Sequence, residues 1–307
     1  ASFRSDSVSK PYGASMTDSH TISTTTLSAR IKAEGAELTS LQDAGGDELL
    51  WQAGPEWPRH APVLFPIVGR LPGDTLRHDG QTYRMTQHGF ARDQSFEWLE
   101  RSDSEVRLLL RDSETTRAIY PFSFDLELRY AAEGSTLRVE TRVRNTGNVP
   151  LPYSVGAHPA FRWPLAPDVP KERHRLVFSA EESGRSFTLD GGFLSSERDL
   201  PMEGRTLALS ADLVAGDALV MHDVASRSVR FVALEPDDRE ERAIEVAWSG
   251  FRDLGVWSKP QGAPFLCIEP WSGTAPPVGW DDDFMRKPGG EILPPGEERS
   301  YLWSVTI

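Results

Sequence analysis

The chain has 307 residues, of which 38% are hydrophobic and 26% are charged, so it can form a packed core. Its formal net charge is −13, from 46 acidic and 33 basic residues, and no segment is rich in Lys or Arg. We therefore expect no nucleic-acid partner, because proteins that bind nucleic acids carry a basic surface.

Other features limit location and domain organisation. No apolar run approaches the roughly 20 residues that span a bilayer, so we expect no membrane partner. The single cysteine, Cys267, cannot form an intrachain disulfide. This fits a reducing compartment, and we expect a cytoplasmic protein. Residues 1–20 are rich in Ser without the apolar segment of a signal peptide. We predict a flexible N-terminal arm over residues 1–24 and a single domain over residues 25–307.

In the first third of the chain, alternating apolar and polar residues indicate strands. They fall at Thr25–Ile31, Gly35–Leu41, Glu48–Trp51 and Gln81–Thr86. The apolar run Pro62–Val68 contains Pro66, which disfavours a central strand and predicts a buried loop or an edge segment. Residues 71–80 are rich in turn formers and predict a connection.

The middle of the chain has the clearest alternation, at Thr136–Asn145. Leu137, Val139, Thr141 and Val143 would lie on one face, and Arg138, Glu140, Arg142 and Arg144 on the other. Such a pattern is typical of a half-buried strand, and the four charges predict a solvated sheet face. Further strands are expected at Ser95–Ser102, Glu105–Arg111 and Phe124–Ala132, with a helical turn within Asp112–Tyr120.

The last part of the chain continues the pattern. Short strands are predicted near residues 175–180, 185–189, 206–210, 217–222, 228–233, 243–249, 253–258, 265–269 and 300–307. The segment Trp271–Pro295 is long, irregular and rich in Gly, Pro and Asp. With fifteen or more strands and few helices, the predicted fold is all-β, a large antiparallel β-sandwich.

Several familiar kinds of site are not supported by the sequence. The seven histidines include no His-x-His or His-x-x-x-His pair, so we expect no metal site. A Gly-x-Ser-x-Gly nucleophile turn does not occur, and the glycine-rich stretches are not followed by an amphipathic helix. These features disfavour a serine hydrolase and a phosphate-binding loop.

Three polar residues instead lie where an apolar strand meets a tight turn, namely His88, His158 and Glu269. Such junctions present side chains from a rigid scaffold, so these residues are candidate site residues, with His158 and Glu269 as the pair that would transfer protons. The structural alternative remains open for each. A histidine before proline is often a hydrogen-bonding residue of the core, and a carboxylate at a strand end often accepts N–H groups or forms an ion pair.

Four motifs, in this order, resemble the aldose 1-epimerase (galactose mutarotase-like) superfamily, and in particular its LacX-type branch. They are Ala-Pro-Val-Leu-Phe-Pro-Ile-Val-Gly-Arg ending at Arg70, His-Gly-Phe-Ala-Arg from His88 to Arg92, Gly-Ala-His-Pro-Ala-Phe around His158, and Cys-Ile-Glu-Pro-Trp around Glu269. The resemblance extends from about Thr26 to the C-terminus.

The resemblance implies a β-supersandwich that interconverts the α and β anomers of an aldose, a small-molecule sugar, without a metal or redox cofactor. It implies that Glu269 is the base that takes the proton from the C1 hydroxyl, and that His158 is the acid that protonates the ring oxygen. By the same resemblance, Arg70 and His88 hold the sugar. Asp217 corresponds, through a shorter match, to an aspartate that binds hydroxyls remote from C1.

Arg92 leaves the substrate open. The His-Gly-Phe-Ala-Arg form also looks like the hexose-6-phosphate mutarotases of this superfamily, in which arginines hold the phosphate. Arg92 would have this role, or it would only pair with an acidic neighbour such as Asp93, and Lys259 is a further candidate near the site. We set a free aldohexose ahead of a hexose phosphate. A non-catalytic carbohydrate-binding protein with the same fold is the alternative from a different class.

Overall fold

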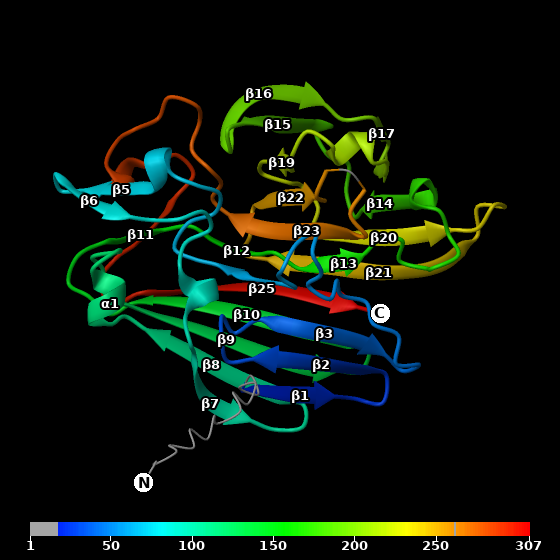
Figure 1. Cartoon of the computed structure of the whole chain (residues 1–307), viewed down its shortest axis with the longest axis horizontal. Coiled ribbons are helices and arrows are strands. Elements are labelled where there is room, and N and C mark those ends of the chain that lie inside the picture. Colours follow the sequence, from blue (N-terminus) through cyan, green and yellow to red (C-terminus); the bar gives the residue numbers. More distant parts are fainter. Residues whose placement is uncertain (1–17, 261) are drawn as a thin grey trace, which may run out of the picture.

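A computed structural model describes residues 18–260 and 262–307, and a ten-stranded antiparallel sheet is its largest element (Figure 1). The strands in spatial order are β17 (Met202–Glu203), β18 (Thr206–Ala208), β14 (His174–Phe178), β20 (Ser228–Leu234), β21 (Glu240–Ser249), β25 (Glu298–Thr306), β10 (Thr136–Asn145), β9 (Phe124–Glu133), β8 (Glu105–Arg111) and β7 (Glu97–Arg101). In β10, Leu137, Val139 and Val143 are buried while Arg138 and Arg144 are exposed, which confirms the predicted faces.

A second, eight-stranded sheet carries most of the predicted site motifs. Its strands in order are β16 (Phe193–Asp199), β15 (Arg185–Asp190), β19 (Leu219–Met221), β22 (Asp253–Trp257), β23 (Phe265–Ser272), β12 (Val155–Ala157) and β4 (Val63–Leu64), and β13 (Ala160–Arg162) also pairs with β23. Since β23 lies inside the sheet, all eight of its residues are buried.

Smaller elements complete the fold. They are a three-stranded sheet of β1 (Ser19–Ser23), β2 (Leu27–Lys32) and β3 (Leu38–Asp43), the pairs β5 (Thr75–His78) with β6 (Gln81–Arg84) and β11 (Leu151–Tyr153) with β24 (Glu291–Leu293), the helix α1 (Glu114–Arg117), and the 3₁₀ turns η1 (Pro72–Asp74), η2 (Ala91–Asp93), η3 (Lys171–Arg173), η4 (Asp212–Val214) and η5 (Phe284–Arg286).

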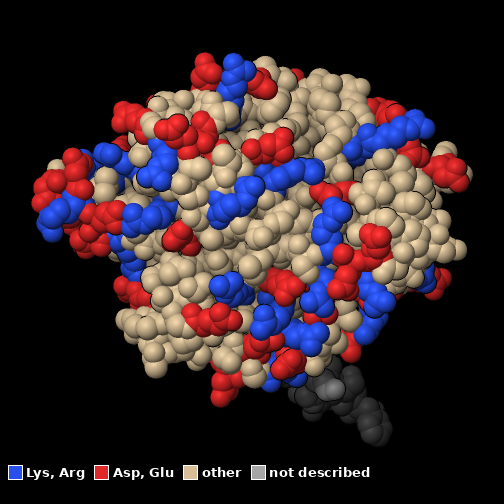
Figure 2. All heavy atoms as spheres, turned by 180° about the vertical axis from the view of Figure 1, so that it is seen from behind, with Lys and Arg blue, Asp and Glu red and all other residues tan. Residues whose placement is uncertain are grey.

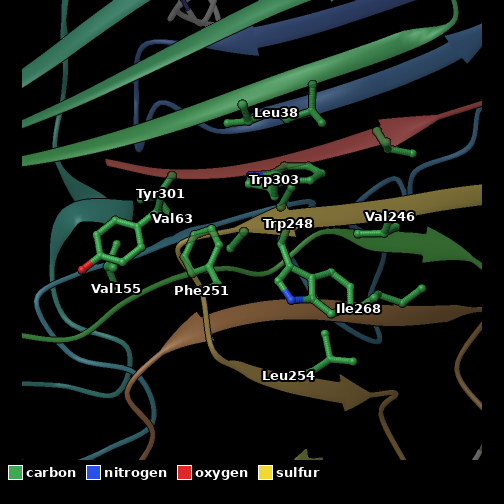
Figure 3. Packing of buried hydrophobic residues seen from close by; sticks show 14 of the residues in the cluster. Leu38, Val63, Val155, Val246, Trp248, Phe251, Leu254, Ile268, Tyr301 and Trp303 are labelled. Atoms are coloured by element: carbon green, nitrogen blue, oxygen red, sulfur yellow. The ribbon is translucent and has the colours of Figure 1, made fainter. Parts of the chain in front are cut away.

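The hydrophobic core lies between the two large sheets (Figure 3). Trp248 of β21 and Trp303 of β25 are direct neighbours in the pairing register, and both are almost fully buried. Figure 3 shows their rings above Ile268 of β23 and Leu254 of β22. The residues of β23 that alternate with Ile268 therefore point away from this core, because successive side chains of a strand face opposite sides.

Several predictions for connections are confirmed and others are wrong. The run Pro62–Val68 contains only the two-residue edge strand β4, as expected, and α1 falls within Asp112–Tyr120. Residues 48–51 form isolated bridges rather than a strand, because Glu48 turns its carboxylate back to accept the N–H groups of Leu41 and Leu50. Residues 71–80 are not merely a connection, since they contain β5 of a hairpin.

The N-terminal boundary also differs from the prediction. Residues 19–23 form β1, paired along its length with β2, although they were expected to belong to an arm over residues 1–24. Alternation is short in Ser-His-Thr-Ile-Ser, where Ile22 is the only fully buried side chain, so the pattern was weak. The rest of that prediction, residues 1–17, lies outside the described residues.

Acidic and basic side chains are interspersed over the side of the molecule in Figure 2. Ion pairs connect neighbouring strands of the ten-stranded sheet, among them Arg107 with Glu127 at 2.8 Å and Arg230 with Glu240 at 2.6 Å. Paired, exposed charges of both signs are typical of a solvated face. No helix among the described residues is long and apolar enough to cross a membrane.

Candidate active site

A pocket of about 320 Å³ lies on the face of the eight-stranded sheet that points away from the core. Strands β15, β16, β19, β22 and β23, together with several loops, supply its walls. The residues lining it are Trp57, Val68, Gly69, Gln87, His88, Arg92, His158, Leu189, Gly192, Leu194, Asp217, Ala218, Val220, Trp257, Lys259, Glu269, Trp271, Thr274 and Ala275.

Strand β23 supplies the carboxylate because of its alternation. Leu266 and Ile268 belong to the core between the sheets, whereas Trp271 belongs to a separate apolar cluster on the pocket side. Glu269 shares the face of Trp271, since the two are two residues apart in one strand. The core therefore fixes the direction in which Glu269 points.

Trp271 forms a flat floor beneath the pocket, and two glycines make room for it. A Cβ on Gly156 of β12 would lie 2.5 Å from the indole Cδ1, and one on Gly255 of β22 would lie 2.4 Å from Cζ2. The ring thus spans from one neighbouring strand to the other across β23. A flat aromatic face of this kind suits stacking against the apolar face of a sugar ring.

His158 and Glu269 meet at this floor. His158 Nε2 lies 3.2 Å from Glu269 Oε2, and the side chains are 7% and 1% exposed. Within residues 18–260 and 262–307, the contact at Glu269 Oε2 lacks hydrogen-bond geometry, and His158 Nδ1 has no hydrogen-bond partner. Trp57 stacks on the imidazole with ring centroids 4.9 Å apart, and Trp257 meets it edge-on at 5.8 Å. The pair is thus held by packing, with polar capacity left over for a ligand.

Burial controls the protonation of the pair. It raises the pKa of the Glu269 carboxyl well above its usual value, which the Trp271 side chain opposes in part and the nearby Asp217 carboxylate reinforces. Burial also lowers the pKa of His158 to about 3, and the guanidinium groups of Arg92 and Arg59 act likewise. Both effects disfavour charge, so the empty pocket at neutral pH holds a neutral pair with one transferable proton.

His88 reaches the pocket from the loop after β6, held by Gly69. The backbone N–H of His88 donates to the Gly69 carbonyl at 2.7 Å, and the backbone N–H of Gly69 donates to the ring Nδ1 of His88 at 3.1 Å. Because Nδ1 accepts, the proton of the neutral ring resides on Nε2. Burial, with help from His158 and Arg92, holds the pKa of His88 well below its usual value. His88 is therefore a fixed N–H donor at neutral pH.

The pocket brings together five of the six predicted site residues: His88, Arg92, His158, Asp217 and Glu269. Arg70, the sixth, does not line it. Its guanidinium pairs with Asp74 at 2.9 Å, and its alkyl chain lies beside Gly192, where a Cβ would be 3.0 Å from Arg70 Cδ. Arg70 therefore lies at the edge, behind a lining residue.

Two cations do line the pocket. Arg92 Nη2 donates to the Gln87 carbonyl at 2.6 Å, its Nε lies 4.0 Å from Asp93, and burial lowers its pKa to about 10, so it remains charged at neutral pH. Lys259 donates to the Glu56 carbonyl at 2.5 Å. Each cation is thus held by a backbone carbonyl at the rim of the pocket.

Sequence reasoning missed Trp57, which covers His158. Trp57 lies between Pro55 and Pro58, outside any predicted strand, and nothing in the local sequence directs its ring toward a histidine about a hundred residues away. Gln87 and Thr274 were also missed. The proximity of Gln87 to His88 in the sequence was the one available signal.

One group of residues within the described chain could offer three ligand atoms to a metal ion: His158, Cys267 and Glu269, whose ligand atoms lie within 4.8 Å of one another. Cys267 is fully buried and does not line the pocket. Burial raises the pKa of its thiol well above the usual range, so at neutral pH the sulfur keeps its proton and is a poor ligand.

Comparisons with known proteins show the family of the chain. The sequence profile of the aldose 1-epimerase family matches residues 18–301, so the chain belongs to that family. It is 31% identical to the protein LacX of Lactococcus lactis, with 92% of this chain and 96% of LacX covered.

Solved structures show the same fold. The galactose mutarotase related enzyme from Lactobacillus acidophilus is 32% identical, with a TM-score of 0.87 over 94% of this chain and 96% of that one. A galactose mutarotase-like protein from Lactobacillus casei is 30% identical, with a TM-score of 0.86 over 94% of this chain and 99% of that one. The fold is thus a galactose mutarotase-like β-sandwich.

Proposed function

We propose that the protein is an aldose 1-epimerase that interconverts the α and β anomers of an aldohexose by acid–base opening of the ring. The observation that carries this proposal is the distance of 3.2 Å between His158 Nε2 and Glu269 Oε2, in a buried pair at the floor of a sugar-sized pocket. Ring opening removes a proton from one oxygen and delivers a proton to another, so an acid and a base must act together.

In the proposed reaction, Glu269 takes the proton from the C1 hydroxyl as the C1–O1 bond becomes a carbonyl. The C1–O5 bond breaks, and His158 gives its proton to O5. The open aldehyde rotates about C1–C2, and O5 then attacks the other face of C1. His158 takes back the O5 proton and Glu269 returns a proton to O1, so the enzyme ends unchanged.

These roles require the shared proton to be on His158 when the sugar is bound. In the empty pocket burial favours the proton on Glu269, because a buried carboxylate is the less stable form. A sugar hydroxyl that donates to Glu269 stabilises its carboxylate, and Oε2 faces His158 Nε2 at 3.2 Å without a hydrogen bond of good geometry in the described residues. Sugar binding thereby moves the proton to His158, where the reaction uses it.

The neighbouring residues suit a sugar. His88 presents its Nε2–H as a fixed donor, Asp217 offers a carboxylate and Trp271 a flat apolar surface. Polar groups that converge around an apolar platform are typical of carbohydrate sites. Arg70 would act only through the rim of the pocket, since it does not line the cavity.

The test is anomer exchange measured by NMR saturation transfer or by polarimetry on freshly dissolved α-sugar. The purified protein should accelerate the exchange of at least one member of a panel of aldohexoses. Absence of acceleration with every hexose and hexose 6-phosphate would end the proposal. Calorimetric binding without acceleration would instead assign a non-catalytic carbohydrate-binding protein.

A hexose 6-phosphate is the second candidate substrate, favoured by Arg92 and Lys259 in the pocket lining. Arg70 lies apart from them, paired with Asp74, and Arg92 and Lys259 are each already bonded to a carbonyl. We therefore place the free sugar first. Replacing Arg92 by Gln should raise the KM of a phosphosugar far more than that of a free sugar if the phosphate binds there.

A further inference from the structure

A close contact links the sugar pocket to a part of the molecule outside it. Ala275 lies so close to Gly69 that a Cβ on Gly69 would be 2.6 Å from the Ala275 Cβ. Gly69 also has a positive φ of 75°. Its peptide holds His88 through two hydrogen bonds, so the position of Ala275 limits the position of the His88 ring.

The segment that carries Ala275 separates two cavities. Thr274 and Ala275 line the sugar pocket and also a second cavity of about 430 Å³, whose other walls include His222, Asp253 and Gly290. Both residues are buried, but a wall between two cavities has fewer packing neighbours than a segment inside the core. Polar contacts therefore contribute to its position.

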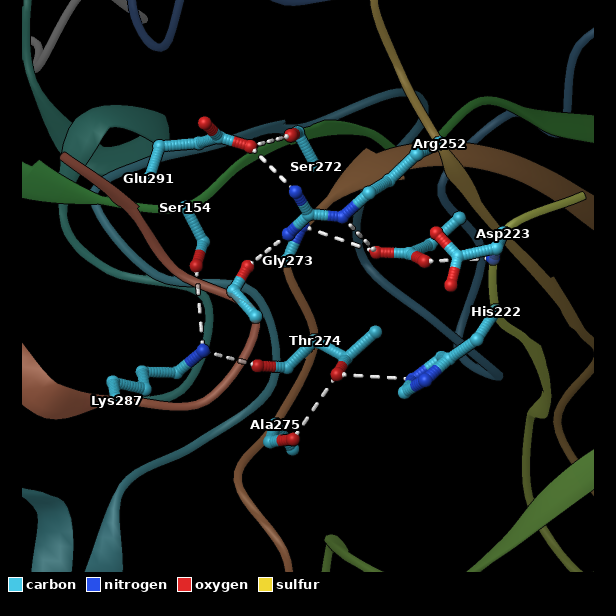
Figure 4. A network of polar contacts seen from close by, with 12 residues as sticks. Ser154, His222, Asp223, Arg252, Ser272, Gly273, Thr274, Ala275, Lys287 and Glu291 are labelled. Carbon is cyan, nitrogen blue, oxygen red and sulfur yellow. Dashed lines mark hydrogen bonds and ion pairs between the residues drawn. The ribbon is translucent and has the colours of Figure 1, made fainter. Parts of the chain in front are cut away.

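Lys287 supplies one of these contacts (Figure 4). Its side chain is 6% exposed, and its Nζ donates to the Thr274 carbonyl and, at 3.3 Å, to Ser154 Oγ. No carboxylate in the described residues lies within ion-pair distance of this ammonium, although Asp253 is near enough to favour its charge. A buried lysine without a direct counter-ion is costly, which points to a role.

Asp253 binds the same segment at its N-terminal end. Its Oδ2 accepts the Gly273 N–H at 3.2 Å, and its Oδ1 accepts the Asp223 N–H at 3.2 Å. Gly273 has a φ of 94°, and a Cβ there would lie 2.3 Å from Ser154 Oγ. The backbone from Gly273 to Ala275 is thus held at two points: Asp253 accepts the Gly273 N–H, and Lys287 donates to the Thr274 carbonyl.

We propose that Lys287 is a positioning residue for His88: it holds the Thr274 carbonyl, and thereby Ala275 against Gly69, so that the His88 imidazole stays aimed into the pocket. This inference rests on the proposed function in that His88 is taken as a sugar-binding donor. Lys287 itself touches no substrate, since it does not line the sugar pocket.

The kinetic test uses the Lys287→Met variant, which keeps the length of the side chain but removes its donors. Because His88 then loses its fixed orientation, KM for the aldose should rise on the order of tenfold with a smaller change in kcat. Asp253→Asn should shift KM in the same direction, which keeps the test valid if one variant folds poorly. Arg286→Met is the matched control: Arg286 precedes Lys287, is exposed, pairs with Asp282, and should have no effect.

A double-mutant cycle separates positioning from a general loss of structure. In a His88→Ala background, Lys287→Met should produce little further change, because the residue it positions is gone. If the two effects on KM multiply, Lys287 acts elsewhere and the proposal is overturned.

A readout independent of catalysis is NMR of protein labelled with ¹⁵N-histidine. The His88 signals, identified by their loss in His88→Ala, should show the Nε2–H tautomer in the wild type and a shifted Nδ1 in Lys287→Met, with no shift in Arg286→Met. Unchanged His88 signals in Lys287→Met would overturn the inference. If no sugar is anomerised, the proposed function fails, and the spectra still decide whether Lys287 positions His88.

Discussion

The imidazole of His158 and the carboxyl of Glu269 face each other at 3.2 Å in a setting that disfavours charge on both. Aromatic rings cover the histidine and the sheet buries the carboxyl, and this burial shifts both pKa values toward the neutral forms. This relationship gives direct predictions for substitution and for pH.

Replacement of Glu269 by Gln should abolish anomerisation while leaving the fold intact. An amide cannot accept the C1 proton, and loss of a general base typically costs about 10²–10⁴-fold in rate. Gln has nearly the shape of a protonated glutamate, which burial already favours here. Thermal unfolding should therefore show little change. A variant that retains full activity would remove Glu269 as the base.

The stability of the protein should depend on pH through the same pair. The folded pKa of Glu269 is raised, so above about pH 4.5 the unfolded chain loses this proton before the folded one, and stability falls as pH rises. The wild type should therefore lose unfolding free energy relative to Glu269→Gln between pH 5 and 8, as measured by urea denaturation. A constant difference would show that Glu269 is ionised in the folded state.

The titration of His158 should make stability rise with pH, the opposite of the effect of Glu269, and it should do so at lower pH. Its folded pKa is about 3 against an ordinary value of 6.5, so the unfolded chain binds more protons between these values. Stability that is present above pH 6.5 is lost as pH falls toward 3. Denaturation of a His158→Gln variant should show a weaker loss over this range than the wild type does.

The floor of the pocket should be sensitive to one methyl group. Gly255→Ala would place a Cβ 2.4 Å from the Trp271 ring, so the indole must move out of its plane across the sheet. Overpacking of this kind costs about 1–3 kcal/mol, and KM should rise because the stacking surface tilts. Gly147→Ala is the control, since a Cβ there would have only ordinary contacts at 3.4 Å and beyond. Equal thermal stability and KM in both variants would contradict the role of Gly255.

The burial of Lys287 should make the unfolding free energy depend on pH in neutral to alkaline solution. Burial lowers its pKa from 10.5 to about 7, so between these values the unfolded chain binds more protons, and folding becomes more favourable as pH rises. The unfolding free energy of the wild type should therefore increase relative to Lys287→Met from pH 7 to 10. Comparing the two variants cancels the titration of groups that they share.

Most of the strands, and the proximity of most candidate site residues, could be predicted from the sequence. Residues with chemistry at the junctions of strands and turns, His88, His158 and Glu269, do converge, because each junction is fixed by an apolar strand with a clear pattern. Arg70 had the right motif, yet its long side chain turns to Asp74 outside the pocket, a choice that depends on tertiary neighbours.

Other features had no signal of their own in the sequence. Trp57 covers His158 because its loop also packs against Trp257 of β22 and Phe265 of β23. Strand β6 was predicted, whereas its partner β5 lies in a stretch where turn residues hid the strand. Lys287 stands in a Gly- and Pro-rich segment that predicted only irregular chain. Its buried ammonium contacts Ser154, which is 133 residues away in the sequence, and Thr274, which lies across a loop of the same irregular segment, so no local pattern indicates it.

The alternation of β23 has a consequence for how such a protein changes its substrate. A slip of one residue in this strand would turn Glu269 and Trp271 inward and expose Ile268, so the proposed catalytic carboxylate cannot be moved without disrupting the core. The position of this side chain and the stability of the fold are therefore linked. Changes of substrate preference are expected at Trp57, Gly192 and Lys259, which come from loops that can vary while β23 stays in place.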